Sequence, residues 1–517
     1  MRRLTLAILI VASCTLEVFT QAKPLDGFDD YVAKAVKDWR TPGLAVAVIK
    51  NDEIVFERGY GVRELGKPGA VDEHTLFAIG STTKAMTAAL AAMLVDEKKL
   101  EWDAPVARYL PWFQMKDPAV SREVTVRDLL THRAGLGNAD FLWYGQRNST
   151  EEILRRVRLI DPAYSMRSGF IYQNIMYAAA GAVIESASGK SWPEMIRTRI
   201  FEPLGMKDSQ TTAARLASLP NVASPHALVD GRVRVIDNAS VDPVAAAGAI
   251  WSSVDDMSKW MKFMLDGGRV GGPSGKRLLS EESFHELFAP QTIAPYEMYP
   301  TTRITKPHWM TYGLGWFQQD YRGEALDFHT GSIDGMVAIH GLVRDEGLGV
   351  YVLGNLDHAE LRHAIMYTVI DRYAGRQDHD WSADFLKLYD GLKKEADQER
   401  ASRIAARVAG TSPSLPLAKY AGSYSDPLHG NVSVTLKGAG LRLQYGTAFV
   451  GPLEHWHYDT FRAKWEAAWR EPDLVTFVLD ADGKASAVEV AGARFARAPD
   501  ARGQEGRERQ ERQERQD

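Results

Sequence analysis

The residues best suited to chemistry are a serine and a lysine at Ser81-x-x-Lys84, where an apolar run leads into a predicted helix. Positions i and i+3 share a helix face, so we expect the Lys84 amine beside the Ser81 hydroxyl. A lysine held away from water loses its proton more readily, and the helix N-terminus favours negative charge on the serine. Alternatively, Ser81 caps the helix and Lys84 is a solvated charge. The spacing thus predicts either an activated nucleophile or an ordinary helix start.

Two later segments offer the other groups that acyl transfer requires: a proton relay, substrate-positioning groups and an oxyanion hole. Tyr172 can pass a proton to a leaving group, and Asn174 offers both a donor and an acceptor to a substrate amide. In His329-Thr330-Gly331, the histidine can line one wall of a cleft as a cation or hydrogen-bonding group, and the glycine lets substrate approach the backbone. Their presence favours the nucleophile over the cap.

The chain carries three motifs in the order Ser81-x-x-Lys84, Tyr172-x-Asn174 and His329-Thr330-Gly331. In type and order they resemble the motifs of the serine β-lactamase and penicillin-binding-protein-like family. The similar branch includes class C β-lactamases, S12 D-aminopeptidases and DD-carboxypeptidases, and EstB-type esterases. Segments 124–136 and 312–316 are also typical of that branch, and the resemblance covers residues 26–375.

The resemblance implies an acyl-enzyme on Ser81, with Lys84 and Tyr172 sharing the proton transfers and titrating as a coupled pair. It implies an oxyanion hole formed by the backbone N–H groups of Ser81 and Ser332. It implies no cofactor and no metal. The substrate-binding residues that it implies are Asn174, His329, Thr330 and Gly331.

The chain departs from the family pattern at His329, where β-lactamases have a lysine that offers a permanent charge to a carboxylate. Histidine is mostly neutral near pH 7. This favours an exported esterase or D-amino-acid-type peptidase acting on small ester, amide or peptide substrates. The alternatives are a β-lactamase or DD-carboxypeptidase and, outside enzymes, a non-catalytic cell-wall binding module.

Two further polar residues near the motifs are expected to be structural. We expect His132 to buttress a helix corner within segment 131–136. Asp334 follows the third motif closely; a turn role is favoured, and binding of a substrate amine is the alternative.

The pattern of apolar runs predicts an α+β domain. Strands are expected at 44–49, 54–61, 313–317, 338–343 and 349–353, and helices at 28–36, 81–97 and 359–373, with a helix-rich stretch at 126–204. Strands at both ends of the domain imply one sheet that joins them, with a helical insertion. The resemblance specifies a β-lactamase/transpeptidase-like antiparallel sheet flanked by helices, with an all-helical subdomain.

Beyond residue 375 the texture of the sequence changes. Residues 376–415 are expected to form a charged helical linker, and residues 416–498 show short alternating strands typical of a small barrel or sandwich. Tyr420-Ala421-Gly422-Ser423-Tyr424 is similar to the lipocalin-like domain attached to some S12-type hydrolases. The Arg-, Glu- and Gln-rich tail at 499–517 has the composition of a disordered segment.

The N-terminus and overall charge bear on location and partners. Residues 1–22 read as a signal peptide, with cleavage expected after Ala22; alternatively, segment 11–14 resembles a bacterial lipobox in which Cys14 is lipidated and tethers the protein to a membrane. Either indicates a secreted or periplasmic bacterial protein. The net charge of −5 argues against nucleic acid as a partner. The expected partner is a small-molecule or peptide substrate, and the oligomeric state stays open.

Overall fold

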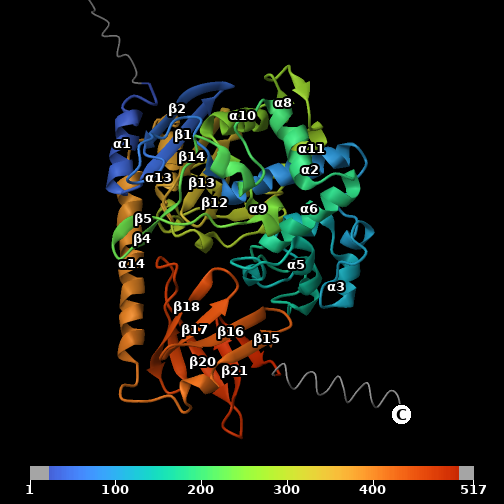
Figure 1. The fold of residues 1–517 in the computed structure, drawn as a ribbon. Coiled ribbons are helices and arrows are strands. Elements are labelled where there is room, and N and C mark those ends of the chain that lie inside the picture. The colour runs from blue at the N-terminus through green and yellow to red at the C-terminus, as the bar shows by residue number, and fades with distance from the viewer. Residues whose placement is uncertain (1–22, 500–517) are drawn as a thin grey trace, which may run out of the picture.

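The computed structural model describes residues 23–499, which form a large α+β domain and a smaller β-barrel joined by a long helix (Figure 1). The predicted signal peptide, Cys14 and all but the first residue of the predicted tail lie outside the described residues. Among residues 23–499, no helix combines the length and apolar character that a membrane crossing needs.

The large domain is built on an eight-stranded antiparallel sheet with the order β2-β1-β14-β13-β12-β11-β10-β9. Strand β1 pairs with β14 on one side and with β2 on the other, so the sheet joins the two sequence ends of the domain as predicted. The strands are β1 (Gly43–Lys50), β2 (Glu53–Gly61), β9 (Thr292–Ile293), β10 (Met310–Tyr312), β11 (Phe317–Tyr321), β12 (Glu324–Ile333), β13 (Met336–Val343) and β14 (Leu348–Gly354).

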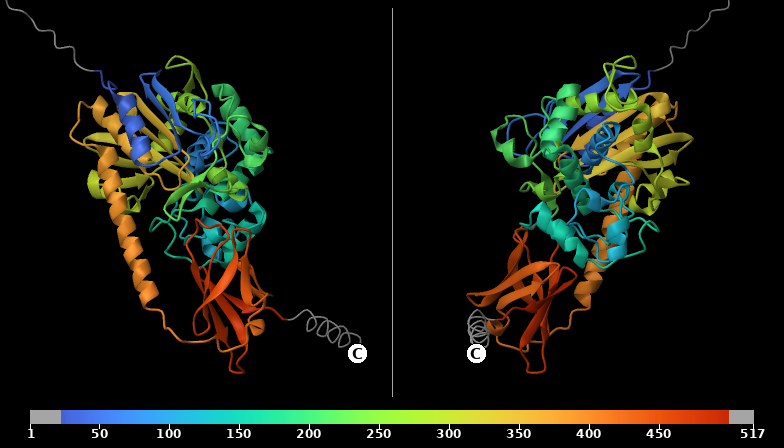
Figure 2. Two further views of the ribbon diagram at one scale, coloured as in Figure 1. Left: turned by 60° about the vertical axis from the view of Figure 1, so that its left-hand side comes forward. Right: turned by 90° about the vertical axis from the view of Figure 1, so that its right-hand side faces the viewer.

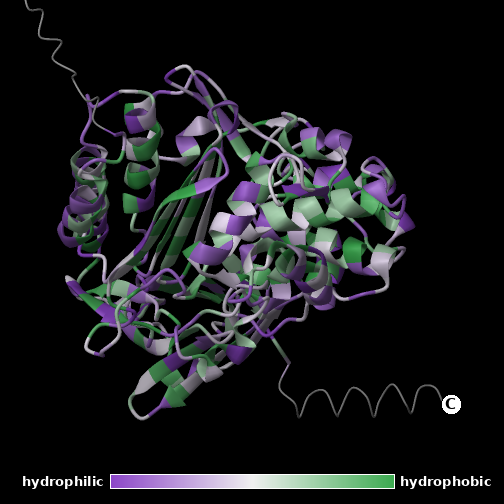
Figure 3. Ribbon diagram, turned by 90° about the horizontal axis from the view of Figure 1, so that it is seen from above, coloured by the Kyte–Doolittle hydropathy of each residue, from purple (hydrophilic) through white to green (hydrophobic). Residues whose placement is uncertain are grey.

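Helices cover both faces of this sheet, which lies between two helical layers in Figure 3. Alternate residues of β1 face opposite layers: Ala45 and Ala47 join one hydrophobic core, and Val46 and Val48 join the other. Because both faces are covered, β1 reads as a continuous apolar run. One layer contains α1 (Phe28–Asp38) and α13 (Leu361–Tyr373); the main helices of the other are α2 (Thr83–Asp96), α6 (Asn174–Ser188) and α10 (Val254–Leu265).

The remaining helices of the large domain are short and lie mostly in the helix-rich stretch and the loops that follow it. They are α3 (Pro118–Glu123), α4 (Val126–Leu130), α5 (Thr150–Arg156), α7 (Trp192–Ile196), α8 (Glu202–Leu204), α9 (Ala245–Gly248), α11 (Glu281–Phe288) and α12 (Thr302–Thr305). The two-stranded pairs are β3 (Phe77–Ala78) with β6 (Trp251–Ser252), β4 (His226–Val229) with β5 (Arg232–Val235), and β7 (Arg269–Val270) with β8 (Lys276–Arg277).

The prediction of a strand at 313–317 is wrong. Strand β10 ends at Tyr312 and β11 begins at Phe317, and the residues between them form the tight connection that pairs the two strands. The Gly313 N–H donates to the Trp316 carbonyl at 2.8 Å, which closes the turn. Apolar content alone misled the prediction, because Leu314 and Trp316 are buried although they lie in a turn.

The C-terminal unit is a closed eight-stranded barrel, which confirms the predicted all-β unit. Its apolar core is separate from those of the large domain. Helix α14 (Trp381–Ala405) runs down one side of the molecule and connects the two parts (Figure 2). The barrel strands are β15 (Gly422–Asp426), β16 (Gly430–Lys437), β17 (Gly440–Tyr445), β18 (Phe449–His457), β19 (Thr460–Ala463), β20 (Asp473–Leu479), β21 (Ala485–Val490) and β22 (Ala493–Arg497).

Candidate active site

Ser81 and Lys84 meet at the start of α2. A short 3-10 turn at Gly80–Thr82 leads into the helix, and Lys84 Nζ lies 3.0 Å from Ser81 Oγ. No side-chain cap is formed at the start of the turn or of α2, so the capping alternative for Ser81 is wrong. Twelve of the fourteen α2 residues are buried, which fixes this helix as the central element of the domain.

Lys84 is fully buried, and its amine touches three oxygens. Besides Ser81 Oγ, Nζ lies 2.8 Å from Asn174 Oδ1 and 2.9 Å from the Ala247 carbonyl oxygen. A neutral amine has two N–H donors and one lone pair. Donation to the Asn174 and Ala247 oxygens therefore leaves the lone pair for the Ser81 hydroxyl. Burial lowers the pKa of Lys84 well below its ordinary value, which favours this neutral form.

Asn174 is held in turn by Asp140, a residue that the sequence analysis did not single out. The Asn174 amide nitrogen donates to both carboxylate oxygens of Asp140 at 3.1 Å, and Trp143 Nε1 donates to the same carboxylate at 2.7 Å. Because the amide nitrogen faces Asp140, the amide oxygen faces Lys84. Asp140 thus fixes the orientation of the group that accepts one Lys84 hydrogen.

Tyr172 also lies against the amine, with Lys84 Nζ 4.7 Å from the centre of its ring. Its hydroxyl is buried next to Ser81 and makes no hydrogen bond of ordinary geometry with the described residues. Burial raises the pKa of Tyr172 well above its ordinary value, so the phenol is a proton donor. His132 supports this segment, because its Nδ1 accepts from the Gln173 N–H at 3.0 Å and its ring centre lies 4.4 Å from that of Tyr172.

His329 differs from the expectation that it would offer a charge or hydrogen bond to substrate. It lies within β12 and is almost fully buried. Its Nε2 lies 3.0 Å from the Tyr312 hydroxyl and its Nδ1 2.6 Å from the Thr330 carbonyl oxygen, so both ring nitrogens have partners inside the protein. Burial lowers the pKa of His329 to about 3, and the ring is neutral. The physical reason is aromatic packing, because the ring centres of Phe317, Tyr312 and Tyr172 lie 5.1, 5.8 and 6.0 Å from that of His329.

The end of β12 touches the turn that carries Ser81. A Cβ added to Gly331 would lie 1.9 Å from the Ile79 carbonyl oxygen and 3.1 Å from the Ser81 nitrogen, and a Cβ added to Gly80 would lie 2.8 Å from the Ser332 nitrogen. Both positions therefore require glycine. This contact brings the backbone N–H groups of Ser81 and Ser332 into one small region beside the Ser81 hydroxyl.

Arg362 of α13 orients one of these N–H groups, and the sequence analysis did not single it out either. Its Nη1 donates to the Gly331 carbonyl oxygen, and also to Ser332 Oγ at 2.9 Å. In a trans peptide the C=O and N–H point in opposite directions. Because Gly331 and Ser332 share a peptide unit, the Ser332 N–H points away from Arg362.

The structure thus gathers Ser81, Tyr172 and Asn174 around the Lys84 amine, with Gly331 and the Ser332 backbone beside them. Thr330 lies next to this group, but its hydroxyl is 3.0 Å from the Tyr299 hydroxyl, which engages it within the protein. His329 is buried behind the group, and Cys14 lies outside the described residues.

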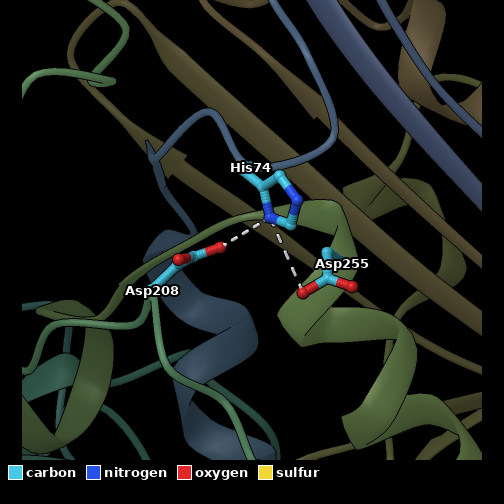
Figure 4. Close-up of side chains that lie close together, drawn as sticks. All are labelled: His74, Asp208 and Asp255. Carbon is cyan, nitrogen blue, oxygen red and sulfur yellow. Dashed lines mark hydrogen bonds and ion pairs between the residues drawn. The ribbon is translucent and has the colours of Figure 1, made fainter.

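A separate cluster of potential metal ligands lies at His74, Asp208 and Asp255, whose side chains point toward one another from different segments (Figure 4). His74 Nδ1 is 3.0 Å from Asp208 Oδ2 and 3.8 Å from Asp255 Oδ2. Asp255 is also paired with Lys259 at 2.7 Å. Because these charges satisfy one another, we describe the cluster as an ion-pair network.

The model of the family named Beta-lactamase matches residues 28–374. The chain belongs to the Beta-lactamase family. This is a family of serine hydrolases, and the resemblance carried by the three motifs is confirmed. A second model, "Domain of unknown function (DUF3471)", matches residues 406–508, which include the barrel.

Two curated relatives show how far the similarity extends. The unguisins hydrolase ungD of Aspergillus violaceofuscus is 30% identical over 485 residues, which cover 85% of this chain and 83% of that protein. The protein flp of Staphylococcus aureus is 23% identical over 337 residues, which cover 64% of this chain and 62% of that protein. The first alignment is long enough to extend beyond the Beta-lactamase domain.

Solved structures share the fold across nearly the whole chain. An octameric penicillin-binding protein homologue from Pyrococcus abyssi matches with a TM-score of 0.60 at 22% identity, covering 91% of this chain and 99% of that one. SurE matches with a TM-score of 0.54 at 21% identity, covering 92% and 99%, and a structure of SurE with D-Leu is also similar. These likenesses confirm the predicted β-lactamase/transpeptidase-like fold.

Proposed function

We propose that this protein is an exported serine hydrolase that forms an acyl-enzyme on Ser81 with small ester, amide or peptide substrates. The observation that carries the proposal is the arrangement at Lys84. Two neutral oxygens take the amine's hydrogens, and its third neighbour is the Ser81 hydroxyl. A buried, neutral amine in this position is a general base for the serine.

In the proposed acylation, Ser81 Oγ attacks the substrate carbonyl and its proton passes to Lys84. The oxyanion accepts hydrogen bonds from the Ser81 and Ser332 N–H groups, each worth about 3 kcal/mol of barrier. Tyr172, protonated and beside Ser81, donates a proton to the leaving group and recovers one from the Lys84 ammonium. Water then repeats the sequence in deacylation and releases the acid product.

Two features support an esterase or a D-amino-acid-type peptidase as the finer assignment. His329 is neutral and buried, so it supplies no positive charge for a substrate carboxylate. The relative that is 30% identical is named for hydrolysis of unguisins, not of β-lactams. A β-lactamase or DD-carboxypeptidase is therefore the weaker alternative.

The decisive experiment is covalent labelling by a fluorophosphonate, followed by turnover of p-nitrophenyl esters, D- and L-aminoacyl anilides and nitrocefin. We expect labelling and turnover in the wild type and neither in Ser81→Ala. Ser402→Ala, which removes an exposed serine on α14, is the matched control and should behave as wild type. Equal labelling of Ser81→Ala would exclude the proposal, and efficient nitrocefin turnover would favour the β-lactamase alternative.

Export is proposed from the N-terminal sequence and has its own test. The mass of the mature protein from a bacterial host distinguishes cleavage after Ala22 from lipidation at Cys14. An intact N-terminus in the cytoplasmic fraction would contradict both.

A further inference from the structure

The barrel contacts the large domain at a loop, residues 138–148, that lies between α4 and α5; the barrel sits below α5 in Figure 1. Thr447 donates to the Gly145 carbonyl oxygen through its backbone N–H at 2.6 Å and its hydroxyl at 3.1 Å. A Cβ added to Gly145 would lie 2.5 Å from Ala448 Cβ. The two backbones are therefore in close contact.

An ion pair forms a second contact between the barrel and the large domain. Arg470 lies in the connection between β19 and β20, and its Nη2 is 3.0 Å from Asp334 Oδ2. The two side chains are only 12% and 13% exposed. The Tyr144 hydroxyl donates to the other Asp334 oxygen at 2.6 Å, and Arg470 lies 4.8 Å from the centre of the Tyr144 ring. Asp334 thus binds the barrel, rather than serving only in a turn, two residues after Ser332.

The loop that the barrel contacts is the loop that carries Asp140. Phe141, next to Asp140, lies with its ring centre 4.3 Å from that of His429 in the barrel. Trp143 donates to Asp140 and is followed by Tyr144, whose ring contacts Arg470 and Phe449 of the barrel, and by Gly145, which accepts from Thr447. A continuous set of contacts therefore leads from the barrel through this loop to Asn174 and Lys84.

We propose that the barrel positions the catalytic centre, because Arg470 and Thr447 hold loop 138–148 so that Asp140 orients Asn174 against Lys84. Arg470 is a positioning residue here, and the inference rests on the proposed role of Lys84. Loss of the Arg470 charge leaves Asp334 buried without its cation. It also frees the part of the loop that Tyr144 anchors. The expected consequence is a misplaced Asp140 carboxylate.

The pH dependence of Ser81 labelling separates positioning from general stability. The titratable groups around Lys84 are Asp140, Tyr172, Tyr177, His132 and His329. Both tyrosines and both histidines are neutral, so Asp140 supplies the negative charge that favours the Lys84 ammonium. If Asp140 moves away, the acid limb of the labelling rate shifts to lower pH while the rate at its plateau falls.

The experiment compares full-length wild type with Arg470→Met, Tyr144→Phe and the control Arg494→Met, an arginine of β22 that is 62% exposed. We expect Arg470→Met to lower the plateau rate of fluorophosphonate labelling about tenfold, with the shift described. Tyr144→Phe, which keeps the ring, should have the same effect in smaller measure. Hydrogen exchange of segment 138–148, read by mass spectrometry, should quicken in both variants and stay unchanged in the control.

Each outcome decides the inference. A wild-type rate, acid limb and loop exchange in a folded Arg470→Met would overturn it; if that variant does not fold, the same result in Tyr144→Phe does so. Faster exchange with an unchanged rate and acid limb would also overturn it, since the contact would then be structural only. If the wild type is not labelled at Ser81, the proposed function fails instead, and the exchange result still reports whether the barrel orders the loop.

Discussion

Two buried basic side chains flank the candidate active site, and their surroundings differ. Arg362 is paired with both oxygens of Glu360, at 2.9 and 3.1 Å, and also donates to the backbone beside Ser332. Among residues 23–499, Lys84 has no carboxylate partner, and its amine touches only neutral oxygens. One region thus holds a permanent charge, whereas the other holds an amine that can lose its proton.

The pKa shifts on the two sides follow this difference. Beside Arg362, the pKa of Glu360 is held well below its ordinary value although burial opposes this. At Lys84, burial dominates and lowers the pKa of the amine, because the charge of Asp140 reaches it only across Asn174. A buried base that is paired with a carboxylate stays charged and serves structure, whereas a buried base without such a partner is available for proton transfer.

The strongest loss of activity is expected when the Lys84 side is made to resemble the Arg362 side. Lys84→Arg places a permanent cation at this position and cannot supply a neutral amine, so it should lose about 10²- to 10⁴-fold in kcat/KM, as should Lys84→Ala. Turnover of a p-nitrophenyl ester measures this, with circular dichroism to verify folding. Substantial activity in Lys84→Arg would mean that Lys84 is not the base.

The second prediction concerns loss of the ion pair between Arg362 and Glu360. Arg362→Met leaves Glu360 buried without its cation and should lower the free energy of unfolding by about 3–5 kcal/mol in urea titrations. Adding Glu360→Gln should restore part of that loss, because no buried charge then remains unpaired. If the single variant were as stable as wild type, the scaffold role of Arg362 would be wrong.

The third prediction uses pH to separate the two regions. Since neutral Lys84 is the active form and its pKa is lowered, the rate of Ser81 labelling should fall as pH drops through that pKa, by about tenfold per unit below it. His329, with a pKa of about 3, should contribute no inflection near neutral pH. His329→Gln should therefore keep the acid limb where the wild type has it, and a displaced limb would implicate His329 in the titration.

The sequence predicted the proximity of Ser81 and Lys84, because this contact is local. Ser81 and Lys84 lie on one helix, so their proximity follows from helix geometry, and the motifs of the family placed Tyr172 and Asn174 beside them. The α+β sheet and the barrel followed from the alternation of apolar runs. These features depend on short-range spacing or on a recognised order of motifs.

The supporting residues escaped prediction because their contacts are long-range. Asp140 lies 34 positions before Asn174 in a loop, and Arg362 lies 31 positions after Gly331 on a helix, with no motif around either. The burial of His329 was also hidden, because strand alternation does not tell exposed from buried when helices cover both faces. Tertiary packing, rather than local pattern, decides these positions.

His74, a base that is paired but not buried, should contribute least to stability. Its bond to Asp208 raises the pKa of His74, so the stabilisation is fully present below the unfolded pKa, near 6.5, and is lost as pH rises through the folded value. With the side chain 55% exposed, solvent screens the pair, and His74→Ala should cost less than about 1 kcal/mol at mildly acid pH and still less at alkaline pH. Urea titrations at both pH values measure this, with His358→Ala, at a side chain that is 80% exposed, as control. A loss as large as that of Arg362→Met would show that pairing alone, without burial, fixes a base in this fold.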